Sequence, residues 1–101
     1  MIYKQLQGIL LIFKSFFMKK RDTTRYELYD HGRMVYAGIT NDLNRRTAEH
    51  RQEGMNFTSV RKVGPTVTRD TANQWEDDRI STYKANHGGN RPKYNQNDSG
   101  K

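Results

Sequence analysis

The sequence predicts a small α+β domain in which a three-stranded antiparallel sheet is flanked by helices. Two strand-like segments joined by a turn come first, and helix-like segments alternate with a third strand after them. The chain has 101 residues, which is the length of one small domain. In the order strand, strand, helix, strand, helix, the first two strands pair as a hairpin, and we expect both helices to cover one face of the sheet.

The first two strands are predicted from an alternating pattern and from the turn between them. Tyr26 and Leu28 alternate with more polar neighbours, as in a half-buried strand. Residues 30–33, with the sequence Asp-His-Gly-Arg, indicate a hairpin turn, and residues 34–36 form the returning strand. We expect Gly38 to end that strand at a sharp turn of the backbone, where a side chain would obstruct.

The first helix and the third strand follow. Asn41 or Asp42 is predicted to cap the helix, which runs to about Gln52, and Gly54 lies just beyond its end. Residues 57–63 have the β-branched character of a strand, which the next two residues, Gly-Pro, interrupt.

The second helix is predicted to begin near Thr68, a candidate cap, and to end at the His-Gly-Gly sequence that begins at His87. The residues at helical spacing are Ala72, Trp75, Glu76, Arg79, Ile80 and Tyr83. A carboxylate on this stripe needs a partner, because burying it unpaired is costly. A metal cation or an arginine would supply that partner.

Composition points to a polyanionic partner. The formal net charge is +7, which favours nucleic acid, although solubility or an acidic membrane surface would also suit this charge. The chain has no cysteine, so disulfides and thiolate metal sites are excluded. The chain therefore needs no oxidising compartment. We expect a cytoplasmic monomer that uses no small-molecule cofactor.

The first 20 residues differ from the remainder. Their apolar run is interrupted at Lys14 and is too short for a comfortable membrane span. We interpret residues 1–20 as a dispensable extension, with a helix packed on the domain and a membrane anchor as alternatives. The domain itself is predicted at residues 21–96, and residues 97–101 form a polar tail that we expect to be disordered.

A tyrosine, an arginine and a histidine are expected to meet where the second strand turns into the first helix. Tyr36 lies two residues before Gly38, and Tyr26 lies on the neighbouring strand of the hairpin. Arg46 and His50 are four residues apart, so they share one face of a helix. Such side chains can position a nucleophile, bind a phosphate and move a proton, which is what phosphodiester chemistry requires.

This pattern resembles the signature of the GIY-YIG nuclease family. The second half of that signature, Tyr-small-Gly, then Thr, then Arg-Arg-x-x-x-His, stands at residues 36–50. Tyr26 stands one strand upstream, where the first half should lie. Glu76 matches the glutamate expected on a later helix, and Asn95 matches an asparagine expected near the end. The resemblance spans residues 24–96.

The resemblance implies a metal-dependent endonuclease that hydrolyses phosphodiester bonds of DNA. It implies that Tyr26 and Tyr36 surround the attacking water, with Tyr26 a candidate to help deprotonate it, while the identity of the general base stays open. Arg46 would bind the scissile phosphate, and His50 would relay a proton or bind phosphate. The implied catalytic residues are Tyr26, Tyr36, Arg46, His50, Glu76 and Asn95.

Glu76 is the residue that the resemblance assigns to a metal. One divalent ion is implied, Mg²⁺ in the first place and Mn²⁺ as a substitute, because a single carboxylate with several waters suits Mg²⁺. The structural alternative is a buried ion pair, for example with Arg46 or Arg79. Asn95 would orient a side chain or the substrate, and the alternative there is a turn residue.

DNA is the expected partner, with its strandedness open and RNA a further possibility. The basic residues expected to contact the nucleic-acid backbone are Arg45, Arg61, Lys62, Arg69, Arg91 and Lys93. Such contacts set affinity rather than sequence preference, so little intrinsic specificity is expected. Because Thr24-Arg25 replaces Gly-Ile of the signature, the alternative is a weakly active or inactive nucleic-acid-binding module of the same fold.

Overall fold

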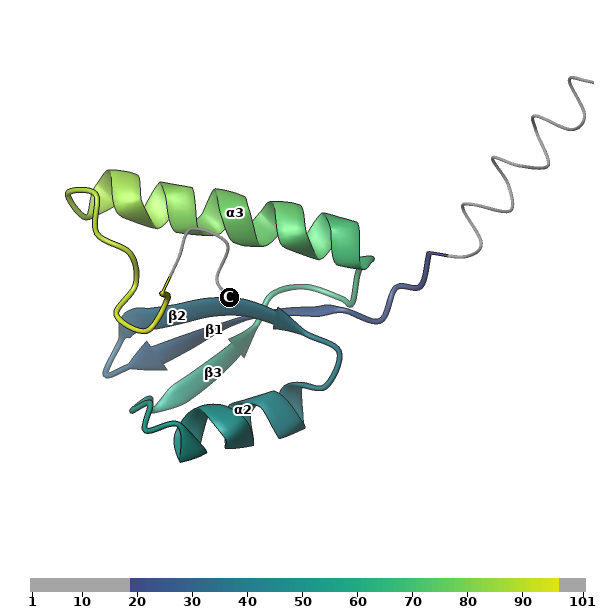
Figure 1. Cartoon of the computed structure of the whole chain (residues 1–101), viewed down its shortest axis with the longest axis horizontal. Helices are drawn as coiled ribbons and strands as arrows, with labels where there is room; N and C mark the ends of the chain where they lie inside the picture. Colours follow the sequence, from purple (N-terminus) through teal and green to yellow (C-terminus); the bar gives the residue numbers. More distant parts are fainter. Residues whose placement is uncertain (1–18, 97–101) are drawn as a thin grey trace, which may run out of the picture.

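The computed structural model describes residues 19–96, which form a three-stranded sheet and two helices (Figure 1). The elements, in chain order, are β1 (Thr24–Asp30), β2 (Arg33–Thr40), α2 (Leu43–Gln52), β3 (Ser59–Lys62) and α3 (Arg69–Asn86). The strand order is β2-β1-β3, and β1 pairs antiparallel with both neighbours. The predicted α+β class and its three-stranded antiparallel sheet are therefore confirmed.

The ends of the chain carry two predictions that the structure does not address. Residues 1–18 of the predicted extension and the whole predicted tail at residues 97–101 lie outside the described residues. Among residues 19–96, neither helix has the length and apolar character needed to cross a membrane.

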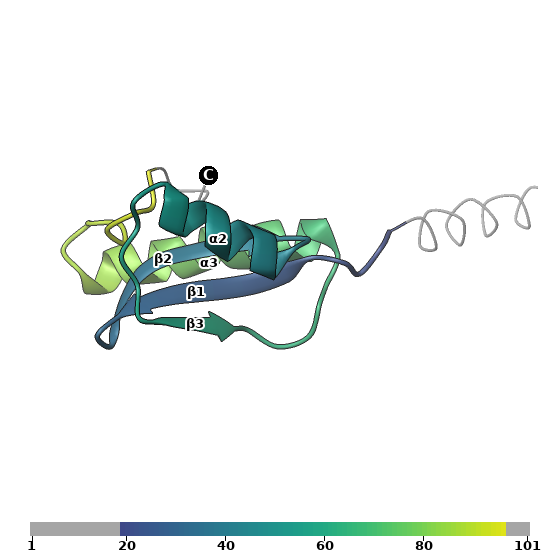
Figure 2. The same cartoon turned by 90° about the horizontal axis from the view of Figure 1, so that it is seen from below.

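The sheet is covered on both faces, so the prediction that both helices lie on one face is wrong. Figure 1 and Figure 2 show α2 and α3 on opposite sides of the strands. The α2 face carries a core of Tyr26, Leu28, Val35, Tyr36 and Phe57, against which Leu43 packs. The α3 face carries a second core of Met34, Ala37 and Ile80, against which Tyr29, Trp75 and Tyr83 pack. Two apolar faces need two covering layers, because apolar surface left in water is unfavourable.

Strand β2 continues through Gly38 to Thr40, so the prediction that this glycine ends the strand at a turn is wrong. Tyr26 pairs with Gly38 across the hairpin, and Leu28 pairs with Tyr36. A Cβ atom on Gly38 would lie 2.5 Å from Cε1 of Tyr36 and 3.0 Å from the hydroxyl of Tyr26. The glycine therefore makes room for two tyrosine rings.

Both predicted helix caps are present. Asp42 caps α2 by accepting a hydrogen bond from the backbone N–H of Arg45, at 3.1 Å. Thr68 caps α3 by accepting one from Thr71, at 3.2 Å. Helix α3 ends at Asn86 with His87 as its C-terminal cap, as predicted, and it buries Ala72, Glu76 and Ile80, which confirms the predicted stripe.

The third strand is shorter than the predicted residues 57–63, because β3 covers only Ser59–Lys62. Phe57, just before it, is buried in the core of the α2 face instead of pairing with β1.

The chain beyond α3 returns to the outer edge of β2. The backbone N–H of Tyr94 donates to the carbonyl of Val35, at 2.8 Å. The side-chain amide of Asn95 then binds both backbone groups of Ala37, accepting from the N–H at 3.0 Å and donating to the carbonyl at 2.9 Å. These bonds occupy backbone groups of β2 that point away from β1.

Candidate active site

Three aromatic rings from three elements meet on the α2 face of the sheet. The hydroxyl of Tyr26 on β1 lies 2.6 Å from Nε2 of His50 on α2, and both residues are 0% exposed. The ring of Tyr36 on β2 is 4.6 Å from that of His50 and 5.9 Å from that of Tyr26, between centroids. The structure therefore brings together three predicted site residues that lie far apart in the sequence.

The protonation states of this cluster follow from its burial. Burial raises the pKa of Tyr26 far above its ordinary value, with Tyr36 acting in the same direction and Arg46 opposing both. Burial also lowers the pKa of His50, and the charge of Arg46 adds to that effect. At neutral pH the phenol and the imidazole are therefore both uncharged, and the tautomer of His50 decides which of them donates across this contact.

Arg46 lies one helical turn before His50 and reaches the same cluster. Its charge opposes the rise that burial causes in the pKa of both Tyr26 and Tyr36, which shows that the guanidinium faces both phenols. Its Nη1 atom also lies 3.2 Å from a carboxylate oxygen of Glu49 and 3.3 Å from one of Glu53. With a side chain about one-third exposed, Arg46 lies at the boundary between the buried rings and solvent.

Sequence reasoning did not single out Glu53, which also touches this cluster. One oxygen of its carboxylate binds Arg46, and the other lies 3.7 Å from Nδ1 of His50. The spacing offered a signal, since Glu53 follows His50 by three residues and Arg46 by seven, so all three lie on one helical face.

Glu76 approaches the cluster from α3. The residue is 2% exposed, and its charge contributes to the raised pKa of Tyr36, of which burial is the main cause. Within residues 19–96, no group of three or more His, Asp or Glu side chains is placed to hold a metal together.

Asn95 lies at the outer edge of β2 instead of among the rings. Its amide oxygen and one amide N–H bind the backbone of Ala37, the residue between Tyr36 and Gly38. Asn95 is 6% exposed, so these bonds are protected from water. The geometry gives it the task of holding the strand segment that carries Tyr36.

A buried carboxylate that sequence reasoning missed lies on the opposite face of the sheet. Glu27, 3% exposed, accepts hydrogen bonds from Nε of Arg79 and from the hydroxyl of Tyr29, and Arg61 lies 3.8 Å away. Arg79, considered above as a partner for Glu76, thus binds Glu27. The network joins β1, β3 and α3, and its place on the α3 face separates it from the aromatic cluster.

The predicted nucleic-acid contacts are distributed over several surfaces. Lys62 pairs with Tyr26 across β1 and β3, so its side chain points to the α2 face. Arg45 is exposed on α2 and lies 3.9 Å from both Asp42 and Glu49. Lys93 lines a hollow of about 400 Å³ next to the cluster, together with Glu53, Gly54, Met55, Tyr94 and Gln96.

The remaining predicted contacts lie farther from the cluster. Arg61 belongs to the Glu27 network on the α3 face, Arg69 is exposed at the first residue of α3, and Arg91 is exposed on the segment after that helix. Of the six predicted contacts, the structure therefore brings Arg45, Lys62 and Lys93 to the side of the sheet that carries the cluster.

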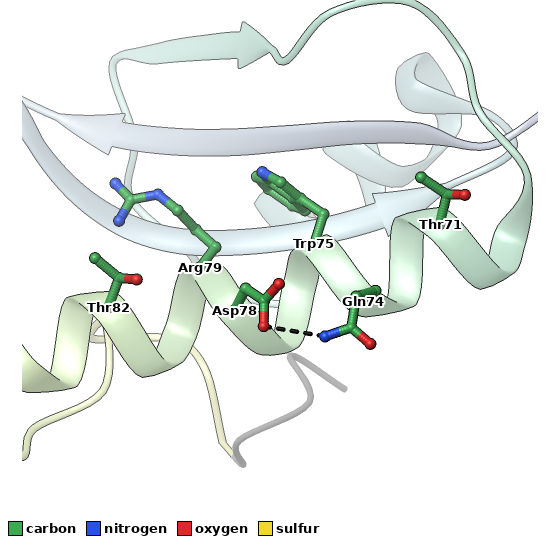
Figure 3. Close-up of a pocket in the computed structure, with 6 residues that line it drawn as sticks. All are labelled: Thr71, Gln74, Trp75, Asp78, Arg79 and Thr82. Atoms are coloured by element: carbon green, nitrogen blue, oxygen red, sulfur yellow. Dashed lines mark hydrogen bonds between the residues drawn. The ribbon is translucent and has the colours of Figure 1, made fainter.

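Helix α3 also borders a shallow groove of about 510 Å³ (Figure 3). In Figure 3, Trp75 and Arg79 extend toward the strands, and the side chain of Gln74 donates to Asp78, at 3.0 Å. The groove contains no residue of the predicted catalytic set. Comparison with family models, with curated proteins and with solved structures finds no match to this chain.

Proposed function

We propose that this chain is a small GIY-YIG-like endonuclease that hydrolyses phosphodiester bonds of DNA with one divalent metal. The observation that supports the proposal is the meeting of Tyr26, Tyr36, Arg46 and His50, which come from β1, β2 and α2. If these residues only formed part of the core, apolar side chains would suffice. Burying a phenol and an imidazole beside an arginine costs free energy that apolar side chains would not.

The proposed mechanism starts at the exposed side of the cluster. Arg46 binds the scissile phosphate and stabilises the negative charge that develops in the transition state. Of the charged side chains around the rings, Arg46, Glu49 and Glu53 are partly exposed and lie on or at the end of α2, so the DNA strand approaches along this helix. The hollow that Lys93 lines offers room for the strand to continue beyond the phosphate.

The buried pair moves the proton. His50 is placed to take the phenol proton through Nε2. Burial opposes this transfer, because it raises the pKa of Tyr26 and lowers that of His50, so the step requires a change in the charge around the pair. Tyr26 then takes a proton from the attacking water, whose oxygen forms the new bond to phosphorus while the bond to the leaving oxygen breaks. A divalent metal bound at Glu76, when present, supplies Lewis-acid stabilisation of phosphate oxygens.

A nucleic-acid-binding module without turnover is the second candidate. The guanidinium of Arg46 is already bound by the carboxylates of Glu49 and Glu53, which weakens the positive potential at the cluster. A module of this kind would bind DNA through the net charge of +7 and would need no metal.

The test is incubation of the purified chain with single-stranded and double-stranded DNA in Mg²⁺, in Mn²⁺ and in a chelator. Fragmentation that requires the metal supports the nuclease, and a Tyr26→Phe protein prepared identically excludes a contaminating enzyme. Salt-sensitive binding without fragmentation would favour the binding module. Neither binding nor cleavage would contradict both candidates.

A further inference from the structure

Glu53 connects the two polar groups of the cluster. It is the C-terminal cap of α2, and its backbone N–H donates to the carbonyl of Glu49, at 2.9 Å. The backbone of Glu53 is therefore fixed while its side chain is half-exposed and able to move. One carboxylate oxygen lies 3.3 Å from Nη1 of Arg46, and the other lies 3.7 Å from Nδ1 of His50.

The two contacts are unequal. The contact with Arg46 is within hydrogen-bonding distance, whereas Nδ1 of His50 is buried and has no hydrogen-bond partner among the described residues. In the tautomer whose Nε2 accepts from Tyr26, the imidazole carries its proton on Nδ1, and this buried donor then points toward Glu53 without reaching it. A small movement of Glu53 would satisfy this donor, and the bond to Arg46 opposes that movement.

We propose that Glu53 is a positioning residue that transfers from Arg46 to His50 when a DNA phosphate binds the guanidinium. This inference rests on the proposed nuclease function and names the link between substrate binding and proton transfer. A phosphate is a strong bidentate partner for arginine, and its negative charge repels the carboxylate. The displaced carboxylate then accepts from Nδ1 of His50.

Every proton that moves in the proposed hydrolysis can be accounted for. The O–H bond of Tyr26 breaks, an N–H bond forms at Nε2 of His50, and the resulting imidazolium lies beside the negative charge of Glu53. The phenolate takes a proton from the attacking water, the water oxygen bonds to phosphorus, and the bond from phosphorus to the leaving oxygen breaks. The imidazolium later returns its proton through Tyr26 to the leaving oxygen, which restores the starting state.

The groups around His50 determine whether phosphate binding raises or lowers its pKa. Tyr26 faces it from β1 and Tyr36 from β2, and the charged groups of its own helix are Arg46, Glu49 and Glu53. Arg46 disfavours the imidazolium, while both carboxylates favour it. Neutralising Arg46 with a phosphate and bringing Glu53 closer therefore both make His50 a stronger base.

The first test follows the His50 imidazole by NMR during pH titration of the full chain, with inorganic phosphate as the probe. Glu53→Gln is compared with Glu49→Gln, because Glu49 also binds Arg46 but makes no ion pair with His50 in the described structure. Phosphate should raise the pKa of His50 clearly in the unchanged chain and in Glu49→Gln, and only weakly in Glu53→Gln. Equal shifts in all three proteins would overturn the proposal.

The second test separates binding from turnover. Glu53→Gln should bind DNA as tightly as the unchanged chain or more tightly, because Arg46 loses a competitor, while kcat falls about tenfold, equivalent to about 1.4 kcal/mol. Glu49→Gln should lower kcat less than Glu53→Gln does, because Glu49 makes no ion pair with His50 among the described residues, and Glu53→Asp should recover part of the loss. A kcat that does not change in Glu53→Gln would overturn the role. If the chain binds phosphate with the expected shift but never cleaves DNA, the nuclease function fails while the Glu53 transfer stands.

Discussion

The hydroxyl of Tyr26 and Nε2 of His50 are 2.6 Å apart, and both side chains are buried. This bond joins β1 to α2 across 24 residues of sequence. It orients the imidazole, and it places the phenol proton on the path that the proposed reaction needs.

Tyr26→Phe should therefore abolish most cleavage and leave the fold intact. Loss of a general acid-base group reduces rates by about 10²–10⁴-fold. The free energy of unfolding should fall by about 1–3 kcal/mol, because Nε2 of His50 loses its buried partner. Cleavage assays and urea unfolding measure the two effects. Tyr29→Phe, which changes a hydroxyl on the other face, is the matched control and should keep full activity.

Arg46→Ala and Arg45→Ala should affect different properties, the first the cleavage rate and the second DNA binding. Arg46 faces the buried phenols and Arg45 faces solvent, so Arg46→Ala should lower the cleavage rate by orders of magnitude, whereas Arg45→Ala should mainly weaken binding. Single-turnover cleavage at saturating DNA, together with binding isotherms, separates these effects. Equal losses from both substitutions would mean that Arg46 belongs to a general basic surface.

Glu76→Gln should remove metal-dependent cleavage and leave DNA binding nearly unchanged. The substitution keeps the shape of a buried side chain and removes the charge that a divalent ion requires. Cleavage measured across a range of Mg²⁺ concentrations tests this. Asp77→Asn, on an exposed position of the same helix, should behave like the unchanged chain. Full activity in Glu76→Gln would remove Glu76 from the metal site.

Gly38→Ala should destabilise the domain. The added methyl group would lie 2.5 Å from the ring of Tyr36, and overpacking of this kind costs about 1–3 kcal/mol. Thermal unfolding should show a lower Tm, and the cleavage rate should fall because both tyrosine rings must shift. A variant with unchanged stability would show that the space beside the rings is not needed.

Stability should decrease as the pH falls below the pKa of an unfolded histidine. Burial, aided by Arg46, lowers the pKa of His50 below 6.5, so the unfolded chain binds more protons between the two values. That part of the free energy of unfolding is present at about pH 7 and declines as the pH falls below 6.5 toward the lowered pKa of His50. Urea unfolding at several pH values measures the decline. His50→Gln should reduce this slope, and an unchanged slope would assign the decline to other groups.

Sequence patterns were sufficient to predict features that depend on residues close together in the chain. Asp42 and Thr68 cap their helices as expected, because a cap is a contact over three residues. The buried position of Glu76 followed from helical spacing alone. The grouping of Tyr26 with Tyr36 was expected from the hairpin and the family resemblance, and helical spacing placed Arg46 beside His50, whereas the Tyr26–His50 contact itself was not predicted.

Features that depend on packing between distant segments were not predicted. Strand β2 is buried on both faces, so each face needs a covering helix. The pattern of apolar and polar residues in one strand does not indicate which helix covers which face. The role of Gly38 follows from two rings that meet only after folding. The two hydrogen bonds between the Asn95 side chain and the backbone of Ala37 join residues 58 apart in the sequence, and no local sequence pattern predicts such a contact.

The Asn95 contact has a consequence for how copies of the protein meet one another. An uncovered strand edge invites pairing with another molecule and leads to aggregation. On the β2 side, the backbone groups of Val35 and Ala37 are already occupied by the chain's own Tyr94 and Asn95. The β3 side is exposed and carries Arg61 and Lys62, whose like charges repel an identical edge. Each border of the sheet is thus protected against growth, one by internal pairing and the other by charge.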